Sequence, residues 1–238
     1  MSDTSLFALS ASTILSMSMD VVAGNIANSD TPGYKREAIN FDDYVERIGA
    51  DDPPTEPMVY RDYVDGNVSY TSNPLDLAIE GEGFYEIEIG DQRLYTRAGH
   101  FRIDVDGNLV TAAGARVLGD DGGPIVFAPT DTDIVVDPEG NVFVNGGGSI
   151  GRIGLVEFAD PQALQRAGDG MYIATGQTAA PATDARIAQG AIEKSNVVAI
   201  REVTLMMNTL RAFQSVQKVA EGEHERIRRA LQTLAQTV

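Results

Sequence analysis

Cysteine and tryptophan are absent from this 238-residue sequence, and histidine occurs only as His100 and His224. The lack of cysteine excludes disulfides, thiolate catalysis and cysteine-ligated metals. Two histidines supply few ligands for a transition-metal site. We therefore expect neither a metal nor a cofactor. No run of about 18 apolar residues is present, which argues against a transmembrane helix.

Positive charge is also scarce, because 18 Lys and Arg residues stand against 35 Asp and Glu residues, for a net charge of −17. Such a chain is a poor binder of nucleic-acid phosphates or of an anionic membrane surface. The start, "MSDTSLFALS", has no positively charged segment and no cleavage site after an apolar block. We expect no Sec signal peptide, so export would take another route. Hydrophobic residues make up 43% of the chain, enough for a packed core.

The first apolar pattern lies between Ser5 and Asn28 and has the period of a helix. Pro32 disfavours the helical conformation of Thr31, and Gly33 favours a turn, so we expect the helix to end near Asn28. The apolar stripe contains Ala8, Ala11, Leu15, Met19, Val22 and Ile26.

The middle of the chain, from about residue 59 to 187, is rich in Gly, Asp and Val in short alternating runs. These runs predict strands at 84–89, 101–105, 133–137, 141–144 and 153–158. Three turns resemble one another, because each has an acidic residue, a glycine and an asparagine before an apolar residue. They are Asp65-Gly66-Asn67, Asp106-Gly107-Asn108 and Glu139-Gly140-Asn141. The similarity is too short to predict a repeat architecture.

The last part, from about Val197 onward, again has a helical period, with mostly apolar residues at alternating steps of three and four. This spacing, about 3.5 residues on average, favours coiled-coil packing. Ser195 or Asn196 is the expected N-cap. The seam contains Val203, Met206, Leu210, Phe213, Gln217, Ala220, His224, Ile227, Leu231, Leu234 and Val238.

These patterns predict an α+β fold. Long N- and C-terminal helices would pair in a coiled-coil-like module, beside a central and mainly antiparallel β domain. The expected parts are 1–36 for the N-terminal helix and its turn, 37–74 for an extended connector, 75–187 for the β domain and 188–238 for the C-terminal helix. A single pair of helices leaves apolar surface exposed, so we expect neighbouring copies to cover it.

Several patterns resemble catalytic or binding sites but have simpler explanations. Gly146–Gly151 matches a dinucleotide-binding glycine pattern, yet a strand-like run follows where a helix is required, so we interpret it as a hairpin loop. His100 has no evident nucleophile or base nearby in the sequence. His224 lies on the seam, where a polar residue more often fixes the register of helix packing than binds a metal. Glu80 and Glu82 alternate with glycines and suit a turn better than an acid–base pair.

A calcium site is a further possibility, raised by the acidic residues of the middle region. None of them has the spacing of a calcium-binding loop, and solvated turns account for them better. They are Asp104, Asp106, Asp131, Asp133 and Asp137.

"NIANSDTPGYKRE" (Asn25–Glu37) resembles the N-terminal signature of the flagellar rod, hook and hook-associated axial proteins, although Gly24 stands where an Asn or Ser is usual. The blocks 71–87 and 95–119 resemble the central domain of the rod and hook subfamily. The block 193–219 resembles the C-terminal helix region. The matching signature residues are Asn25, Ala27, Asn28, Thr31, Pro32, Gly33, Tyr34 and Lys35.

The resemblance implies a structural subunit of the basal-body rod that transmits torque across the periplasm and has no catalytic role. Its partners would be copies of itself, other rod subunits and the flagellar type III export apparatus. The chain length favours the proximal FlgF type over the distal FlgG type. The implied subunit contacts are the two apolar stripes and the signature region with Asn25, Asn28, Thr31, Pro32, Gly33, Tyr34, Lys35 and Asn196.

Two alternatives from other classes stay open. A wall hydrolase would need a positioned acid–base pair, for which the sequence offers only weak candidates. An oligomeric adhesin-like β protein with coiled-coil ends would leave the Asn-Ser-Asp-Thr-Pro-Gly signature unexplained.

Overall fold

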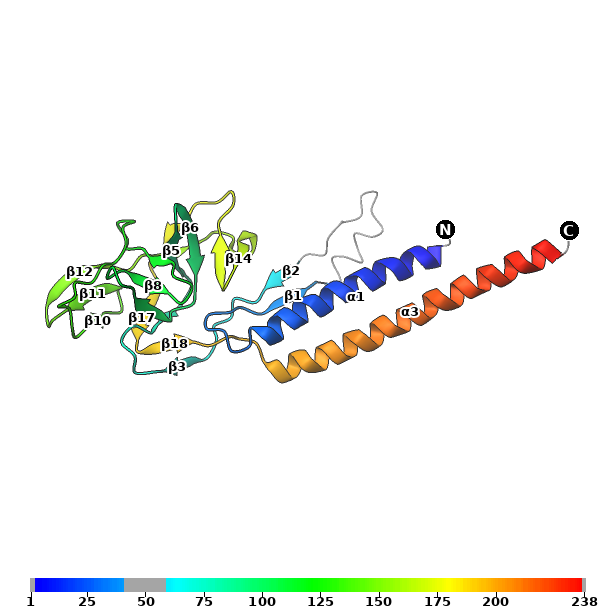
Figure 1. Cartoon of the computed structure of the whole chain (residues 1–238), viewed down its shortest axis with the longest axis horizontal. Coiled ribbons are helices and arrows are strands. Elements are labelled where there is room, and N and C mark those ends of the chain that lie inside the picture. Colours follow the sequence, from blue (N-terminus) through cyan, green and yellow to red (C-terminus); the bar gives the residue numbers. More distant parts are fainter. Residues whose placement is uncertain (1–2, 41–58, 237–238) are drawn as a thin grey trace. The chain divides into compact units, whose positions relative to one another are not determined.

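The computed structural model describes residues 3–40 and 59–236, and they form two compact units (Figure 1). Unit 1 consists of Met1–Ala27, Glu37–Asp62 and Val198–Val238. Unit 2 consists of Asn28–Arg36 and Tyr63–Val197. Part of the connector expected at 37–74, residues 41–58, lies outside the described residues.

Unit 1 is built from the two chain ends. Helix α1 (Asp3–Ala27) and helix α3 (Ala199–Gln236) lie side by side and run in opposite directions (Figure 1). Strand β1 (Glu37–Ile39) pairs antiparallel with β2 (Val59–Arg61), and β1 also packs on α1. No helix in the part of the chain that the structure describes is both long enough and apolar enough to cross a membrane.

The fold predicted from the sequence is wrong in its coiled-coil-like module. Within residues 3–40 and 59–236 there are two α-helices, one near each end, and a multi-stranded antiparallel region between them, without a long paired coiled coil. The predicted seam residues Val203 and Leu210 are 42% and 44% exposed. Their neighbours Glu202 and Thr209 are buried instead. The seam was predicted from apolarity alone, whereas in α3 the polar residues Glu202 and Thr209 are the ones that face inward.

Unit 2 contains one large antiparallel sheet with strand order β14-β15-β6-β5-β9-β8-β7, to which β13 and β16 are added at β5. A short 3₁₀ helix, η1, spans Pro161–Ala163. The strands of this sheet are β5 (Phe84–Ile89), β6 (Gln92–Thr96), β7 (Phe101–Ile103), β8 (Leu109–Thr111), β9 (Arg116–Val117), β13 (Leu155–Glu157), β14 (Gln165–Gly168), β15 (Met171–Ile173) and β16 (Ala180–Pro181).

Three smaller antiparallel sheets complete unit 2, with the strand orders β10-β11-β12, β17-β4 and β18-β3. The turn at Asn145–Gly147 leads into β12, so the glycine-rich stretch is a hairpin without the helix that a dinucleotide site requires. The strands are β3 (Val68–Tyr70), β4 (Leu77–Glu80), β10 (Val135–Val136), β11 (Asn141–Val144), β12 (Gly148–Arg152), β17 (Arg186–Gln189) and β18 (Ala191–Glu193).

Strand β5 lies at the centre of unit 2 and separates two apolar clusters. Tyr85 and Ile87 belong to the larger cluster, and Phe84 belongs to the smaller one, as expected for residues that alternate between the two faces of a strand. The Tyr85 hydroxyl donates a hydrogen bond to the Leu77 carbonyl oxygen at 2.7 Å. Burial raises the pKa of Tyr85 far above its ordinary value, so this phenol stays protonated as a donor.

Candidate functional site: the signature turn and its charge network

The signature residues after α1 form a tight turn whose backbone is held in unit 2. The Thr31 N–H donates to the Asn28 carbonyl oxygen at 3.1 Å, and the Tyr34 N–H donates to the Thr31 carbonyl oxygen at 3.3 Å. The Gly33 N–H donates to the Glu193 carbonyl oxygen at 2.9 Å. The turn is therefore joined directly to strand β18, far along the chain.

Gly33 satisfies two separate requirements of this turn. Its φ is +68°, a conformation that side chains with a Cβ rarely adopt. A Cβ at this position would lie 2.5 Å from the Arg97 carbonyl carbon and 2.7 Å from the Ala98 nitrogen. The glycine thus allows the signature turn to lie directly against the backbone that follows β6.

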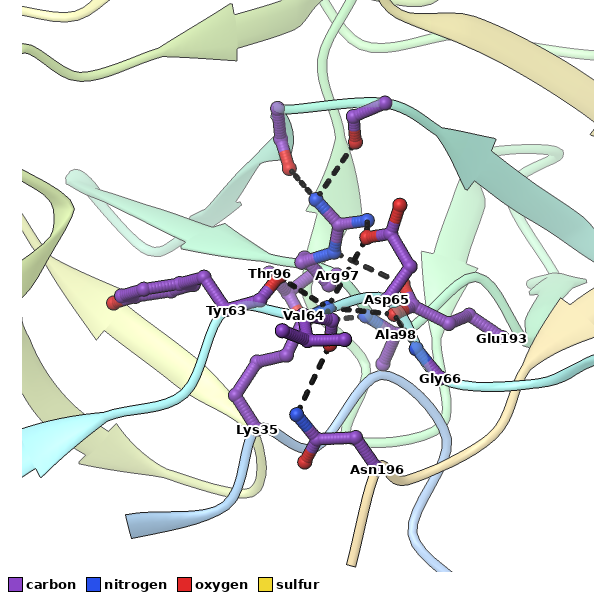
Figure 2. A network of polar contacts seen from close by, with 12 residues as sticks. Lys35, Tyr63, Val64, Asp65, Gly66, Thr96, Arg97, Ala98, Glu193 and Asn196 are labelled. Atoms are coloured by element: carbon purple, nitrogen blue, oxygen red, sulfur yellow. Dashed lines mark hydrogen bonds and ion pairs between the residues drawn. The ribbon is translucent and has the colours of Figure 1, made fainter. Parts of the chain in front are cut away.

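Lys35 is the next charged residue of the signature, and its side chain is fully buried. Its Nζ donates to Glu193 Oε1 at 2.8 Å and to the carbonyl oxygens of Val64 at 3.0 Å and Tyr63 at 3.2 Å. Asp65 Oδ1 lies 3.3 Å away. Figure 2 shows these groups converging on the ammonium group. The buried cation is therefore fully surrounded by acceptors, as a buried charge requires.

Arg97 is the second cation of the network, and its side chain is 3% exposed. Its Nε donates to Glu193 Oε2 at 2.9 Å, and its Nη2 donates to Asp65 Oδ1 at 3.0 Å. Its Nη1 donates to the carbonyl oxygens of Gly81 at 3.1 Å and Gly83 at 3.0 Å. Arg97 thus joins the large sheet to the carboxylates that also hold Lys35.

Glu193 lies between the two cations and accepts a further hydrogen bond from the Gly66 N–H at 3.0 Å. Burial by itself raises the pKa of the Glu193 carboxyl, but the charges of Arg97 and Lys35 and the hydrogen bonds from Lys35 and Gly66 hold that pKa below its ordinary value. The carboxylate is therefore ionised at neutral pH. Two cations and two anions, the second being Asp65, balance one another.

Tyr34 and Asn196 extend the site on either side of Lys35. Tyr34 is buried, and the Arg166 guanidinium lies 5.1 Å from the centre of its ring. The Asn196 side chain accepts a hydrogen bond from the Arg36 N–H at 2.7 Å and donates one to the Val64 carbonyl oxygen at 3.0 Å. The predicted N-cap role of Asn196 or Ser195 is wrong, because α3 begins only at Ala199.

Asn25 is held in unit 1 by a separate set of hydrogen bonds. Its side-chain amide accepts from the Glu37 N–H at 2.9 Å and donates to the Glu37 carbonyl oxygen at 2.7 Å. The amide thus binds both backbone groups of Glu37, as the backbone of a neighbouring β-strand does. The same amide nitrogen lies 3.1 Å from Glu202 Oε2. Arg61 pairs with the Glu37 carboxylate at 2.9 Å. This signature asparagine therefore ties α1 to both β1 and α3.

The predicted interface residues fall into three groups in the structure. Asn25, Gly33, Tyr34 and Lys35 are enclosed by the chain's own residues, together with Val22. The half-buried group is Ala11, Leu15, Met19, Ile26, Asn28, Thr31, Pro32, Asn196, Met206, Phe213 and Ala220. The exposed group is Val203, Leu210, Gln217 and His224. The side chains of Ala8, Ile227, Leu231 and Leu234 lie outside the described residues.

The sequence patterns placed Asp65 only in a turn and gave no role to Arg97, Glu193 or Glu202. Nothing in the residues next to these four in the sequence indicates that they form a network or that Arg97, Glu193 and Glu202 are buried. Lys35 and Glu193 are 158 positions apart, so only the fold shows their pairing.

The remaining polar candidates have structural partners. His100 Nδ1 lies 2.7 Å from Asp76 Oδ1, and that carboxylate also accepts hydrogen bonds from Thr71 and Asn73. Asp104 and Asp137 each bind the backbone and side chain of the asparagine in their own turn. Among the described residues, no group of three His, Asp or Glu side chains is arranged to hold a metal.

Three family models match this chain, in its N-terminal, central and C-terminal parts. "Flagella basal body rod protein" matches residues 6–35, "Flagellar hook protein FlgE/F/G D1 domain" matches 78–144 and "Flagellar basal body rod FlgEFG protein C-terminal" matches 188–233. The first model contains the signature turn, Gly33 and Lys35, and the third contains Glu193. The network thus joins the two terminal family regions to the central one through Arg97.

Known relatives agree with these matches. The flagellar basal-body rod protein FlgF of Caulobacter vibrioides is 36% identical over 234 residues, which covers 95% of each chain. The FlgF protein of Mesorhizobium japonicum is 31% identical over 90% of each chain. The FlgG protein of Agrobacterium fabrum is 32% identical over 84% of this chain and 87% of its own. The chain belongs to the flagellar basal-body rod proteins of the FlgF and FlgG type, which are structural subunits of the rod.

Proposed function

We propose that this chain is the FlgF-type subunit of the rod and that it assembles with copies of itself and with other rod subunits through its terminal helices. The observation that carries the proposal is the apolar surface that α3 leaves exposed within unit 1. Ile200 is 73% exposed, Met207 51% and Val219 57%, in addition to Val203 and Leu210. Exposed apolar residues on one long helix are typical of a surface that another subunit covers.

We propose that helix α3 and the signature turn contribute to the subunit interface in different ways. The exposed residues of α3 are available for contacts with other subunits, and heterologous contacts of this kind generate helical assemblies. Tyr34 and Lys35 are enclosed by unit 2, so we infer that they act indirectly, by fixing the turn. The exposed Ala27 and the half-buried Asn28, Thr31 and Pro32 are signature residues that remain available for direct contact.

The FlgF type is favoured by coverage, since the Caulobacter vibrioides FlgF matches 95% of both chains and the Agrobacterium fabrum FlgG matches 84% and 87%. The FlgG type is the second candidate. Cryo-electron tomography of cells that carry a density-tagged subunit distinguishes them. Density at the proximal end of the rod supports the FlgF type, and density along the distal rod supports the FlgG type.

We further propose that the subunit reaches the periplasm through the flagellar type III export apparatus, without membrane insertion, and acts without nucleic acid or catalysis. The acidic composition supports the absence of nucleic-acid binding. The pairing of buried charges with one another supports a structural role. A peptidoglycan-hydrolysis assay on the purified protein checks the last point, and specific hydrolysis would replace this proposal with the enzyme alternative.

The double variant Ile200→Glu, Leu210→Glu tests the interface. Both side chains are exposed, so we expect an unchanged circular dichroism spectrum. We expect swimming to be lost when the variant is the only copy in the cell, because two carboxylates would be buried on assembly. Ile89→Glu, at a 43% exposed position in unit 2, is the matched control and should swim. Normal swimming of the double variant would contradict the helical interface.

A further inference from the structure

Two consecutive parts of unit 2 share one structure, which the similar turns in the sequence suggest only weakly. Strands β7, β8 and β9 form an antiparallel meander, and β10, β11 and β12 form a second one. The strand registers correspond position by position at a constant sequence offset. The corresponding pairs are Arg102–Val110 with Val135–Phe143, Ile103–Leu109 with Val136–Val142, and Val110–Arg116 with Phe143–Ser149.

The first turns of the two meanders have the same hydrogen bonds. Asp104 Oδ1 accepts from the Asn108 N–H at 2.8 Å, and Asp137 Oδ1 accepts from the Asn141 N–H at 2.8 Å. The second carboxylate oxygens accept from the Asn108 and Asn141 side chains at 2.9 Å and 2.7 Å. The hydrogen bond from the Asn108 side chain is the main cause that lowers the pKa of Asp104. Burial by itself raises the pKa of Asp137, but the hydrogen bonds from Asn141 and from the turn backbone together hold that pKa below its ordinary value.

The glycines of the two turns also correspond. Gly107 and Gly140 have φ values of +86° and +91°. The carbonyl oxygen of Gly107 accepts from the Phe127 N–H at 2.8 Å, and that of Gly140 accepts from the Ile153 N–H at 2.8 Å. The two meanders are therefore copies of one structural unit, and one copy can be used to interpret the other.

The turn of the second meander is covered by a strand of the same chain, β17. The Ile187 N–H donates to the Pro138 carbonyl oxygen at 3.0 Å. Arg186 Nη1 lies 3.4 Å from Glu139 Oε1. The Gln189 side chain binds the backbone of β10. An extended segment with an arginine followed by an isoleucine thus fits this turn.

The turn of the first meander has the same acceptors without such a segment. Val105 corresponds to Pro138 and Asp106 to Glu139. The Val105 side chain is fully exposed, at 101%, and Ile103 is 37% exposed. Strand β7 is the last strand in the order of the large sheet. Among the described residues, no strand lies on its outer edge at Ile103 or Val105.

A groove of about 330 Å³ adjoins this edge, with Ile103, Val105, Phe127 and Pro129 among its lining residues. Its polar residues include Asp104, Asp106 and Asp131, so the groove combines apolar contacts with negative charge. An occupant with an aliphatic side chain next to a positive charge would complement both properties.

We propose that this groove binds an extended segment of another protein in which a basic residue is followed directly by an aliphatic residue, placed as β17 is placed on the second meander. Its backbone N–H would donate to the Val105 carbonyl oxygen, and its basic side chain would pair with Asp106. On the second meander β17 pairs with β4 and contacts the turn through one backbone hydrogen bond and one ion pair, so the bound segment would contact the first turn in the same way. The inference does not depend on the proposed function.

The test uses a synthetic peptide with the β17 sequence, DARIAQG (Asp184–Gly190), titrated into the intact ¹⁵N-labelled protein. We expect a Kd below about 1 mM, and chemical-shift changes confined to residues 103–107 and 127–131. Val105→Asn should raise the Kd at least about tenfold, because an uncharged polar side chain replaces the apolar contact without adding to the negative charge of the groove. Val135→Asn, at a 52% exposed valine of the second meander, is the matched control and should leave the Kd unchanged.

The charge requirement is tested with the peptide DAEIAQG, in which glutamate replaces the arginine. We expect no binding of this peptide up to several millimolar. The proposal is overturned if neither peptide binds, if both bind equally, or if Val105→Asn has no effect. It is also overturned if the shifts lie at residues 134–140, because the peptide would then be exchanging with the chain's own β17.

Discussion

Glu193→Ala should lower the free energy of unfolding by about 3–5 kcal/mol, the range for removing one partner of a buried ion pair. The substitution leaves the buried side chains of Lys35 and Arg97 without their shared carboxylate. Asp65 still faces both cations, but its side chain is 53% exposed, so it compensates only in part. Urea unfolding followed by circular dichroism measures the loss, since the chain has no tryptophan to follow by fluorescence.

Glu139→Ala is the matched control for this prediction. Glu139 also pairs with an arginine, Arg186, but the two side chains are 59% and 66% exposed. We expect a loss below about 1 kcal/mol, as for other surface ion pairs. Equal losses for the two variants would show that the buried network contributes no more than a surface pair.

The network also predicts how stability depends on pH. The folded-state pKa of Glu193 is lowered, chiefly by Arg97 and Lys35 acting against the effect of burial. Its contribution is therefore fully present above the unfolded pKa, near 4.5, and is lost as pH falls through the lower folded value. The stability difference between the wild type and Glu193→Gln should be constant from pH 7 to about 5 and shrink below that. A difference that does not change down to pH 3 would contradict the assignment.

Local patterns predicted much of the β unit from the sequence. Residues 84–89 and 141–144 form strands with the predicted bounds, because alternating apolar residues and flanking glycines define them locally. The steric effect of Pro32 on Thr31 predicts that α1 ends before Thr31, and α1 ends at Ala27. These features depend on neighbours in the sequence, which a single chain displays directly.

The errors in the sequence predictions arise instead from contacts between residues that are far apart in the chain. The buried Glu202 carboxylate accepts a hydrogen bond from the side-chain amide of Asn25, 177 positions away, and the next residue, Val203, is exposed. From the sequence alone Lys35 would be taken for a surface cation, because the residues beside it in the structure, Glu193 and Arg97, are distant in the sequence. Polar residues that are buried by distant partners carry no local signal, so periodicity predicted a coiled-coil seam that is wrong and could not reveal the charge network.

We expect Gly33→Ala to lower the free energy of unfolding by about 3 kcal/mol or more, through two separate contributions. The first contribution is conformational, because a residue with a Cβ in the left-handed region costs about 1–2 kcal/mol. The second is steric, because the new Cβ would lie 2.5 Å from the Arg97 carbonyl carbon, and relieving such a clash costs about 1–3 kcal/mol. Backbone atoms form the contact, so no side chain can rotate away.

Gly90→Ala separates these two contributions. Gly90 has a similar φ, +62° against +68° for Gly33, but apart from Gly90 and its two chain neighbours no atom of the described residues lies within 4 Å of the position of its Cβ. We expect Gly90→Ala to show the conformational cost alone, about 1 kcal/mol, in the same urea titration. If the two alanine variants lose equal stability, the turn does not lie tightly against Arg97. If Gly33→Ala loses more and also abolishes swimming while Gly90→Ala swims, the signature glycine acts by holding the turn on the backbone beside the charge network.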